Sequence, residues 1–290
     1  MRHLWPAMVA VMIITLMQSA AAQVPTFKVT AKEVRIDVLV ADHGKPVTGL
    51  QAVDFEVLDN GVRQEVGFSG FERMPISATM VLDMSRSVAG ELLDRLKGAG
   101  DVLLKGLKKD ERAALITFSH AVKLGSPFTT DHERVKTALD SAQPFGDTSV
   151  IDASYAGLIL AESAFDRPLL IVFSDGLDTL SWLSSKEVLE SAKQTDAVVY
   201  AVSTGRLPDN PFLRDLTKFT GGSLFEDEST ENLSHVFVSI LEEFRRRYLL
   251  TYIPRSVSTS GWHTIKVRVK GSHDKVIYRP GYMSDPSSTK

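Results

Sequence analysis

Hydrophobic residues follow two different spacings along this chain. Near the N-terminus they alternate with polar residues, as in Val34 to Val40, where every second side chain is apolar. Alternation with a period of two is typical of a strand that buries one face. Asn60-Gly61 supplies the two positive-φ residues of a type I′ turn, so the sequence predicts a hairpin between Phe55–Leu58 and Val62–Phe68.

The pattern changes between Ile76 and about Arg247, where short apolar runs alternate with segments of helical periodicity. Such runs are typical of parallel strands buried on both faces, and their alternation with helices predicts a doubly wound, mostly parallel sheet covered on both sides. The expected strands are Ser77–Leu82, Ala113–Phe118, Leu169–Phe173 and Ala197–Val202, with an antiparallel edge strand at Ala121–Leu124. The expected helices are Ala89–Leu107, His132–Ser141, Val150–Ala164, Ser185–Gln194 and Pro211–Phe219.

Strand-like alternation returns at Tyr248 and continues through "HTIKVRVK" and "VIYRPGY". Neither β segment alone has enough strands to bury a face. We therefore expect one small all-β, sandwich-like domain formed by both chain ends, with the α/β domain inserted into it; two separate β pieces are the alternative. The predicted boundaries are residues 23–74 and 248–283 for the β region, 75–247 for the α/β domain and 284–290 for a disordered tail.

The first 22 residues have the pattern of a cleavable signal peptide. Arg2 is followed by an apolar run from Leu4 to Met17 and by Ala20-Ala21-Ala22, which offers a cleavage site. A membrane anchor is the alternative, but no second long apolar run follows, so we expect no membrane span after cleavage. The chain has no cysteine, and an exported protein without disulfides fits a bacterial periplasm or exterior.

Composition and motifs exclude several classes of function. The net charge is −3, so there is no basic excess with which to bind nucleic acid. No H-E-x-x-H or G-x-S-x-G motif is present, which argues against a zinc hydrolase or a serine hydrolase. The single dense basic run, Arg245-Arg246-Arg247, is expected to be a solvated helix end.

Polar residues follow the predicted parallel strands at their carboxyl ends, where open α/β sheets bind ligands. Asp83, Ser85 and Ser87 come after the first strand, Asp175 follows Leu169–Phe173, and Thr148 precedes a helix. All five side chains offer oxygen ligands, which suit Mg²⁺, Mn²⁺ or Ca²⁺. Taken alone, the first three residues could equally end a strand and cap a helix.

This set of loops resembles the von Willebrand factor type A (VWA) domain and its metal-ion-dependent adhesion site (MIDAS). The resemblance rests on D-x-S-x-S at residues 83–87, a downstream threonine at Thr148 and Ser174-Asp175-Gly176 after an apolar strand. It implies direct metal coordination by Ser85, Ser87 and Thr148, with Asp83 and Asp175 binding directly or through water. The flanking segments, including "YLLTYIP" and "RPGY", are similar to the secreted bacterial VWFA-related family described mainly from acidobacteria.

Three further residues are candidates for the rim of this site: Asp147, Asp178 and Trp182. Many family members have Gly-Gly-Thr where this chain has Gly146-Asp147-Thr148, so Asp147 either adds negative charge beside the metal or caps the following helix. Asp178 is either a ligand contact or an ordinary loop residue. Trp182 either contacts a ligand or packs over its own loop.

The resemblance implies a non-enzymatic module that binds a partner protein through an Asp or Glu carboxylate on the bound ion. The alternatives are a structural or assembly component of the cell envelope, without metal-dependent binding, and a metal-dependent hydrolase. The last helix, whose apolar residues include Phe237 and Ile240, leads directly into Tyr248. In integrin-type relatives the corresponding helix shifts on ligand binding, which implies coupling between the metal site and the β region.

Overall fold

The computed structural model describes residues 33–69, 74–164, 166–204, 210–227, 230–272 and 274–284. The predicted signal peptide lies outside these residues, and so does the predicted tail apart from Ser284, which belongs to a strand. Within the described residues, no helix combines the length and the apolar character that a membrane crossing requires.

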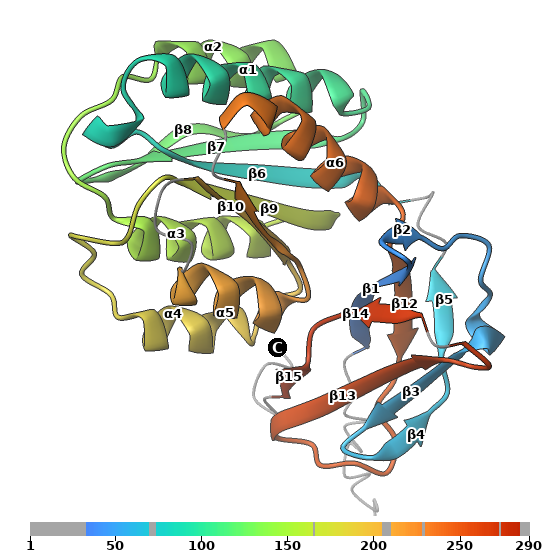
Figure 1. Cartoon of the computed structure of the whole chain (residues 1–290). Helices are drawn as coiled ribbons and strands as arrows, with labels where there is room; N and C mark the ends of the chain where they lie inside the picture. Colours follow the sequence, from blue (N-terminus) through green and yellow to red (C-terminus); the bar gives the residue numbers. More distant parts are fainter. Residues whose placement is uncertain are drawn as a thin grey trace, which may run out of the picture. The chain divides into compact units, whose positions relative to one another are not determined.

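A six-stranded sheet forms the centre of the α/β part, in the order β11-β10-β9-β6-β7-β8 (Figure 1). All neighbours pair in parallel except β7 and β8, which are antiparallel. The strands are β6 (Ile76–Asp83), β7 (Arg112–Phe118), β8 (Val122–Thr129), β9 (Arg167–Ser174), β10 (Val198–Thr204) and β11 (Leu224–Asp227). The predicted mixed α/β fold with a mostly parallel sheet is confirmed, and β11 is a short edge strand that the sequence pattern did not reveal.

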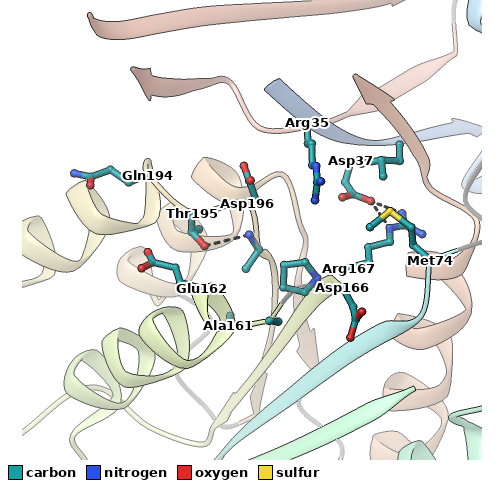
Figure 2. A pocket seen from close by; sticks show the side chains of 14 residues that line it. Arg35, Asp37, Met74, Ala161, Glu162, Asp166, Arg167, Gln194, Thr195 and Asp196 are labelled. Atoms are coloured by element: carbon teal, nitrogen blue, oxygen red, sulfur yellow. Dashed lines mark hydrogen bonds and ion pairs between the residues drawn. The ribbon is translucent and has the colours of Figure 1, made fainter. Parts of the chain in front are cut away.

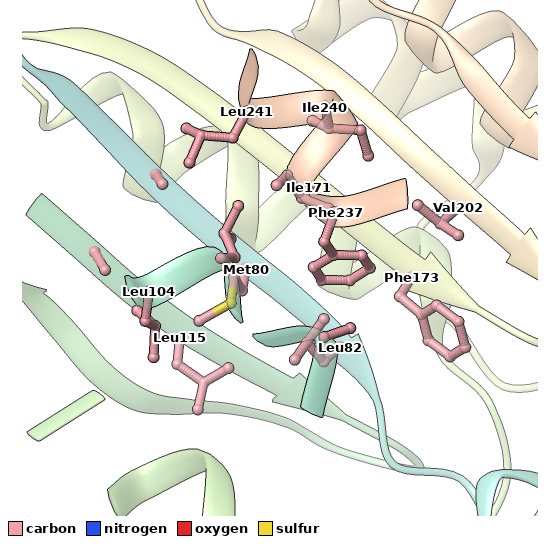
Figure 3. Close-up of a cluster of buried hydrophobic side chains, with 14 of the residues drawn as sticks. Met80, Leu82, Leu104, Leu115, Ile171, Phe173, Val202, Phe237, Ile240 and Leu241 are labelled. Carbon is pink, nitrogen blue, oxygen red and sulfur yellow. The ribbon is translucent and has the colours of Figure 1, made fainter. Parts of the chain in front are cut away.

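Helices cover both faces of this sheet, as Figure 1 shows. One face packs against α1 (Glu91–Gly106), α2 (His132–Ser141) and α6 (Leu233–Arg245). The other face packs against α3 (Val150–Glu162), α4 (Ser185–Ala192) and α5 (Pro211–Thr220). The period-two geometry of β6 explains this division, because Met80 and Leu82 join the first core and Val81 joins the second. Figure 3 shows Met80 and Leu82 among the residues of the first core.

Strands from both chain ends build the β region. In one sheet β1 (Val34–Asp42) lies between β12 (Tyr248–Tyr252) and β14 (Lys275–Ile277), with β2 (Lys45–Pro46) and β5 (Gly67–Ser69) completing it. A second sheet has the order β15-β13-β3-β4. Its strands are β3 (Phe55–Asp59), β4 (Val62–Gln64), β13 (Gly261–Val269) and β15 (Gly281–Ser284). One hydrophobic cluster contains residues of both sheets, including Ile36, Leu250, Val57 and Val267.

The predicted hairpin is correct at its turn and wrong in its second strand. Asn60 and Gly61 both have positive φ, at 46° and 83°. The second strand splits, however, so that β4 pairs with β3 while β5 pairs with β12 in the other sheet. Gln64 lies at this crossing, where its side-chain amide bonds both backbone groups of Arg255. Local alternation does not specify a strand's partner, so the sequence pattern did not reveal the split.

The expectation of a solvated basic run is wrong for Arg247, whose side chain is fully buried. Arg247 follows the end of α6 and donates hydrogen bonds to Tyr200 of β10 and to the carbonyl of Gly221. The first residue of β9, Arg167, pairs with Asp37 of β1 and bonds the carbonyl of Arg247. Buried arginines therefore join the strands of the β region to the α/β part.

Candidate metal centre

Asp83 ends β6, and its side chain is completely buried. Its Oδ1 accepts the Ser85 N–H at 2.8 Å, and its Oδ2 accepts the Ser174 hydroxyl at 2.8 Å. Burial raises the pKa of Asp83 from 3.8 to about 6, against the lowering effect of these hydrogen bonds. No Lys, Arg or His forms an ion pair with Asp83 among the residues that the structure describes. A buried carboxylate of this kind lacks the positive partner that buried charges normally have.

Hydrogen bonds of Ser85 and Ser87 link the loop of Asp83 to Asp175. The Oγ atoms of Ser85 and Ser87 lie 2.9 Å apart, and the Ser87 hydroxyl donates to Asp175 Oδ1 at 2.9 Å. A single 3₁₀ turn, η3 (Arg86–Val88), places the two hydroxyls side by side. Asp175 directly follows β9, and burial raises its pKa as well. The first two predicted loops therefore meet at the carboxyl edge of the sheet.

The loop that carries Thr148 is bonded to the Asp83 loop through its backbone. Phe145 donates its N–H to the Met84 carbonyl at 2.8 Å, and Arg86 donates to the Gly146 carbonyl at 2.9 Å. Gly146 has a φ of 80°, and a Cβ atom at this position would lie 2.6 Å from His120 Nδ1. Only glycine suits this approach, because other residues are strained at positive φ and would clash here.

Thr148 is also bonded to the loop that follows Asp175. Its carbonyl accepts the N–H groups of Thr179 at 2.9 Å and Leu180 at 3.1 Å, and its own N–H donates to Thr179 Oγ1. The Thr148 side chain is buried, at 7% exposure. Backbone hydrogen bonds thus bring the third predicted loop to the same edge as the other two.

The three rim candidates have different environments. Asp178 is fully engaged, since it accepts the Ile151 N–H and both the N–H and hydroxyl of Ser181. It therefore accepts one backbone N–H in the first turn of α3, a capping role for which the sequence offers Asp147 as a candidate. Asp147 itself is exposed. Trp182 is 95% exposed, so its indole does not pack over its own loop.

Some residues that build the site carry no motif signal. Ser174 bonds the carboxylate of Asp83, and Thr179 bonds both backbone groups of Thr148. Asp152, in the first turn of α3, accepts the N–H groups of Trp182 and Leu183 and so holds the rim loop. Hydroxyl and carboxyl residues are common in loops, and only their partners, about 30 positions away in the chain for Thr179 and Asp152, reveal these roles.

The donor set at this edge consists of oxygen atoms. Within the described part of the chain, no group of three or more His, Cys, Asp or Glu side chains could hold a metal ion. Hydroxyls would therefore supply most ligands here, around Asp83 and Asp175. Such a set fits a hard divalent cation, and its two carboxylates match the charge of the ion.

Part of this chain matches a known protein family. The family model for the von Willebrand factor type A domain matches residues 79–177. No curated protein sequence matches the chain.

Solved structures of low sequence identity share the fold. Proximal thread matrix protein 1 from the mussel byssus is 14% identical with a TM-score of 0.54; the match covers 63% of this chain and 49% of the mussel chain. This chain therefore spans about half the length of that protein, which has also been solved with a zinc-occupied MIDAS motif.

Two bacterial structures are similar in the same way. The vWF domain of the type V pili tip protein Mfa5 from Porphyromonas gingivalis is 13% identical with a TM-score of 0.51, covering 64% of this chain and 98% of that one. A von Willebrand factor type A structure from Catenulispora acidiphila is 11% identical with a TM-score of 0.53, covering 79% and 72%. Fold and family model agree, and the chain contains a von Willebrand factor type A domain, matched at residues 79–177.

Proposed function

We propose that this protein is an exported, divalent-metal-dependent binding module for a partner protein. The observation that carries the proposal is the continuous set of oxygens at the carboxyl edge of the sheet, from buried Asp83 through Ser85 and Ser87 to Asp175. Asp83 is buried without a basic partner among the described residues, and a cation would compensate its charge.

In this proposal the ion would be held by five side chains: Asp83, Ser85, Ser87, Thr148 and Asp175. The bound cation supplies a Lewis acid with an open coordination position for an acidic oxygen of the partner. The protein's part is to keep the two carboxylates within hydrogen-bonded loops and to leave Ser87 exposed at the surface. Oxygen ligands favour Mg²⁺, Mn²⁺ or Ca²⁺, and the zinc-occupied MIDAS of the mussel protein makes Zn²⁺ a necessary competitor in any test.

Exposed apolar side chains lie on two of the loops that carry the proposed ligands. Phe145 is 64% exposed, Leu177 46%, Leu180 44% and Trp182 95%. Exposed large apolar residues that lie on neighbouring loops are typical of protein-binding surfaces. We infer a partner segment in which an Asp or Glu is flanked by apolar residues.

A hydrolase remains the weaker proposal. It requires a general base beside the ion, but the oxygens of Asp178 accept hydrogen bonds from the first turn of α3 and from its own loop.

Export to the periplasm or exterior rests on the signal-peptide pattern of residues 1–22.

Calorimetric titration with Mg²⁺, Mn²⁺, Ca²⁺ and Zn²⁺ tests the metal site. We expect binding to the unmodified chain, loss of binding in Asp175→Ala and no change in Asp110→Asn. Asp110 is an exposed control carboxylate that precedes β7, at the other end of the strands. Equal cation binding by Asp175→Ala and the unmodified chain would contradict the proposed site. A pull-down from the native envelope, with and without EDTA, then asks whether a partner is retained only with metal.

A further inference from the structure

A cavity of about 370 Å³ lies at the amino ends of β9 and β10, opposite the edge that carries Asp83. Its lining comes from β1, from the C-terminal part of α3, from residues 166–168 and from the segment between α4 and β10 (Figure 2). Small-molecule sites are often found where two structural parts meet, and the cavity is of sufficient volume for a small metabolite.

Most charges in this cavity are already paired. Arg167 pairs with Asp37, Asp166 with Arg112, and Asp196 with Arg279.

Two lining residues of opposite charge are left over: the side chains of Arg35 and Glu162 form no hydrogen bond or ion pair with the described residues, although the Arg35 backbone carbonyl accepts a hydrogen bond from Arg279. Figure 2 shows Arg35 reaching into the cavity from β1, whereas Glu162 belongs to α3 on another wall. The cavity therefore offers one anion-binding group and one cation-binding group at separate positions.

Helix ends strengthen this division of charge. α3 ends at Glu162, and α4 ends at Ala192, shortly before the lining residues Gln194 and Thr195. The last carbonyl groups of a helix carry partial negative charge and favour cations. The Glu162 side of the cavity is thus the side that suits an ammonium group, and Arg35 suits a carboxylate.

We propose that this cavity binds a small zwitterion, an α-amino acid or a short peptide, with its carboxylate on Arg35 and its ammonium on Glu162. The site is separate from the metal edge and does not depend on the function proposed above. Arg35 and Glu162 are exposed, so their replacement leaves the cores intact.

Titration with the twenty amino acids and with dipeptides and tripeptides, each in the presence of EDTA, tests the proposal. The ligand that binds most tightly is then compared with its methyl ester and its N-acetyl derivative. We expect each derivative to bind about tenfold more weakly or worse, since each loses a charged hydrogen bond. Arg35→Gln should abolish discrimination against the ester, and Glu162→Gln should abolish discrimination against the N-acetyl form.

Arg268→Gln and Glu242→Gln change exposed side chains that do not line the cavity and serve as matched controls. They should bind as the unmodified chain does. Absence of binding by every probe at millimolar concentration overturns the proposal. Equal binding of the ester, or equal binding by Arg35→Gln and Arg268→Gln, also overturns it.

Discussion

The guanidinium of Arg247 donates a hydrogen bond to the hydroxyl of Tyr200 over 2.8 Å, inside the protein. The Tyr200 hydroxyl in turn donates to Glu243 of α6 at 2.7 Å. Burial raises the pKa of Tyr200, so the hydroxyl keeps its proton and the chain of donors keeps its direction. The end of α6 is thus bonded to β10 immediately before the chain enters β12.

Replacing Arg247 should destabilise the whole protein. Arg247→Met removes the buried cation and leaves the Gly221 carbonyl and Tyr200 without this donor. Each buried group that is left without its hydrogen-bond partner costs about 1–3 kcal/mol. Urea unfolding measures the change, and the neighbouring exposed Arg246→Met is the control. Equal stability of both variants would show that the buried bonds contribute little.

Asp83 should make the metal-free protein less stable as the pH rises. Its pKa is 3.8 in the unfolded chain and about 6 in the folded one. The folded state therefore binds more protons between these values, and stability falls across pH ~4 to ~6, by at most about 3 kcal/mol. Unfolding in EDTA at several pH values measures this slope.

Asp83→Asn separates the effect of this carboxylate on metal binding from its effect on the stability of the metal-free protein. The amide is neutral, so we expect a metal-free protein that is more stable at pH 7 by about 1–3 kcal/mol and that no longer binds the cation. Titration with Mg²⁺ and unfolding in EDTA are the two measurements. A variant that is less stable without metal would show that the ionised carboxylate stabilises the fold by itself.

The β region depends on a second buried carboxylate, Asp59. Its oxygens accept hydrogen bonds from Tyr252 at 2.9 Å and Tyr282 at 2.8 Å, and one lies 2.7 Å from His263 Nδ1. Asp59→Ala leaves these groups buried without their partner, at a cost of about 1–3 kcal/mol for each unsatisfied group. The unfolding temperature of Asp59→Ala should therefore be much lower than that of the unmodified chain. The exposed control Asp42→Ala should have nearly the same unfolding temperature as the unmodified chain.

Trp182 should matter for partner binding but not for stability. Its side chain is 95% exposed, and surface substitutions of this kind usually change stability by less than about 0.5 kcal/mol. Trp182→Ala should therefore unfold like the unmodified chain while it retains less partner in the metal-dependent pull-down. The exposed Leu124→Ala, on edge strand β8, is the control. If Trp182→Ala retains as much partner as the unmodified chain, the indole does not belong to the proposed binding surface.

Hydrogen exchange tests whether the metal site and β12 are coupled. Only Arg246 and Arg247 separate α6 from β12, so a displacement of α6 has no flexible linker to absorb it. We expect cation and partner together to alter exchange in Tyr248–Tyr252 and to leave β13 unchanged. Identical exchange with and without them would contradict the coupling.

Sequence alone determined the parts of this protein that depend on local chemistry. The apolar runs of Ser77–Leu82 and Leu169–Phe173 predict buried parallel strands, which the structure contains as β6 and β9. The polar residues that follow them predict Asp83, Ser85, Ser87 and Asp175 at one edge. Periodicity and turn preference act over a few residues, so they can be read along the chain. The residue-level ligand assignments stay predictions.

Only the tertiary structure decided the features that depend on distant partners. The Arg247 side chain is buried where its guanidinium donates to Tyr200 and to the carbonyl of Gly221, and the basic run itself marks neither of these distant partners. Asp178 is withdrawn from the rim by Ile151 and Ser181, and the strand predicted at Val62–Phe68 divides because β12 offers a partner to β5. In each case the deciding energy is a long-range hydrogen bond or strand pairing, which local pattern does not encode.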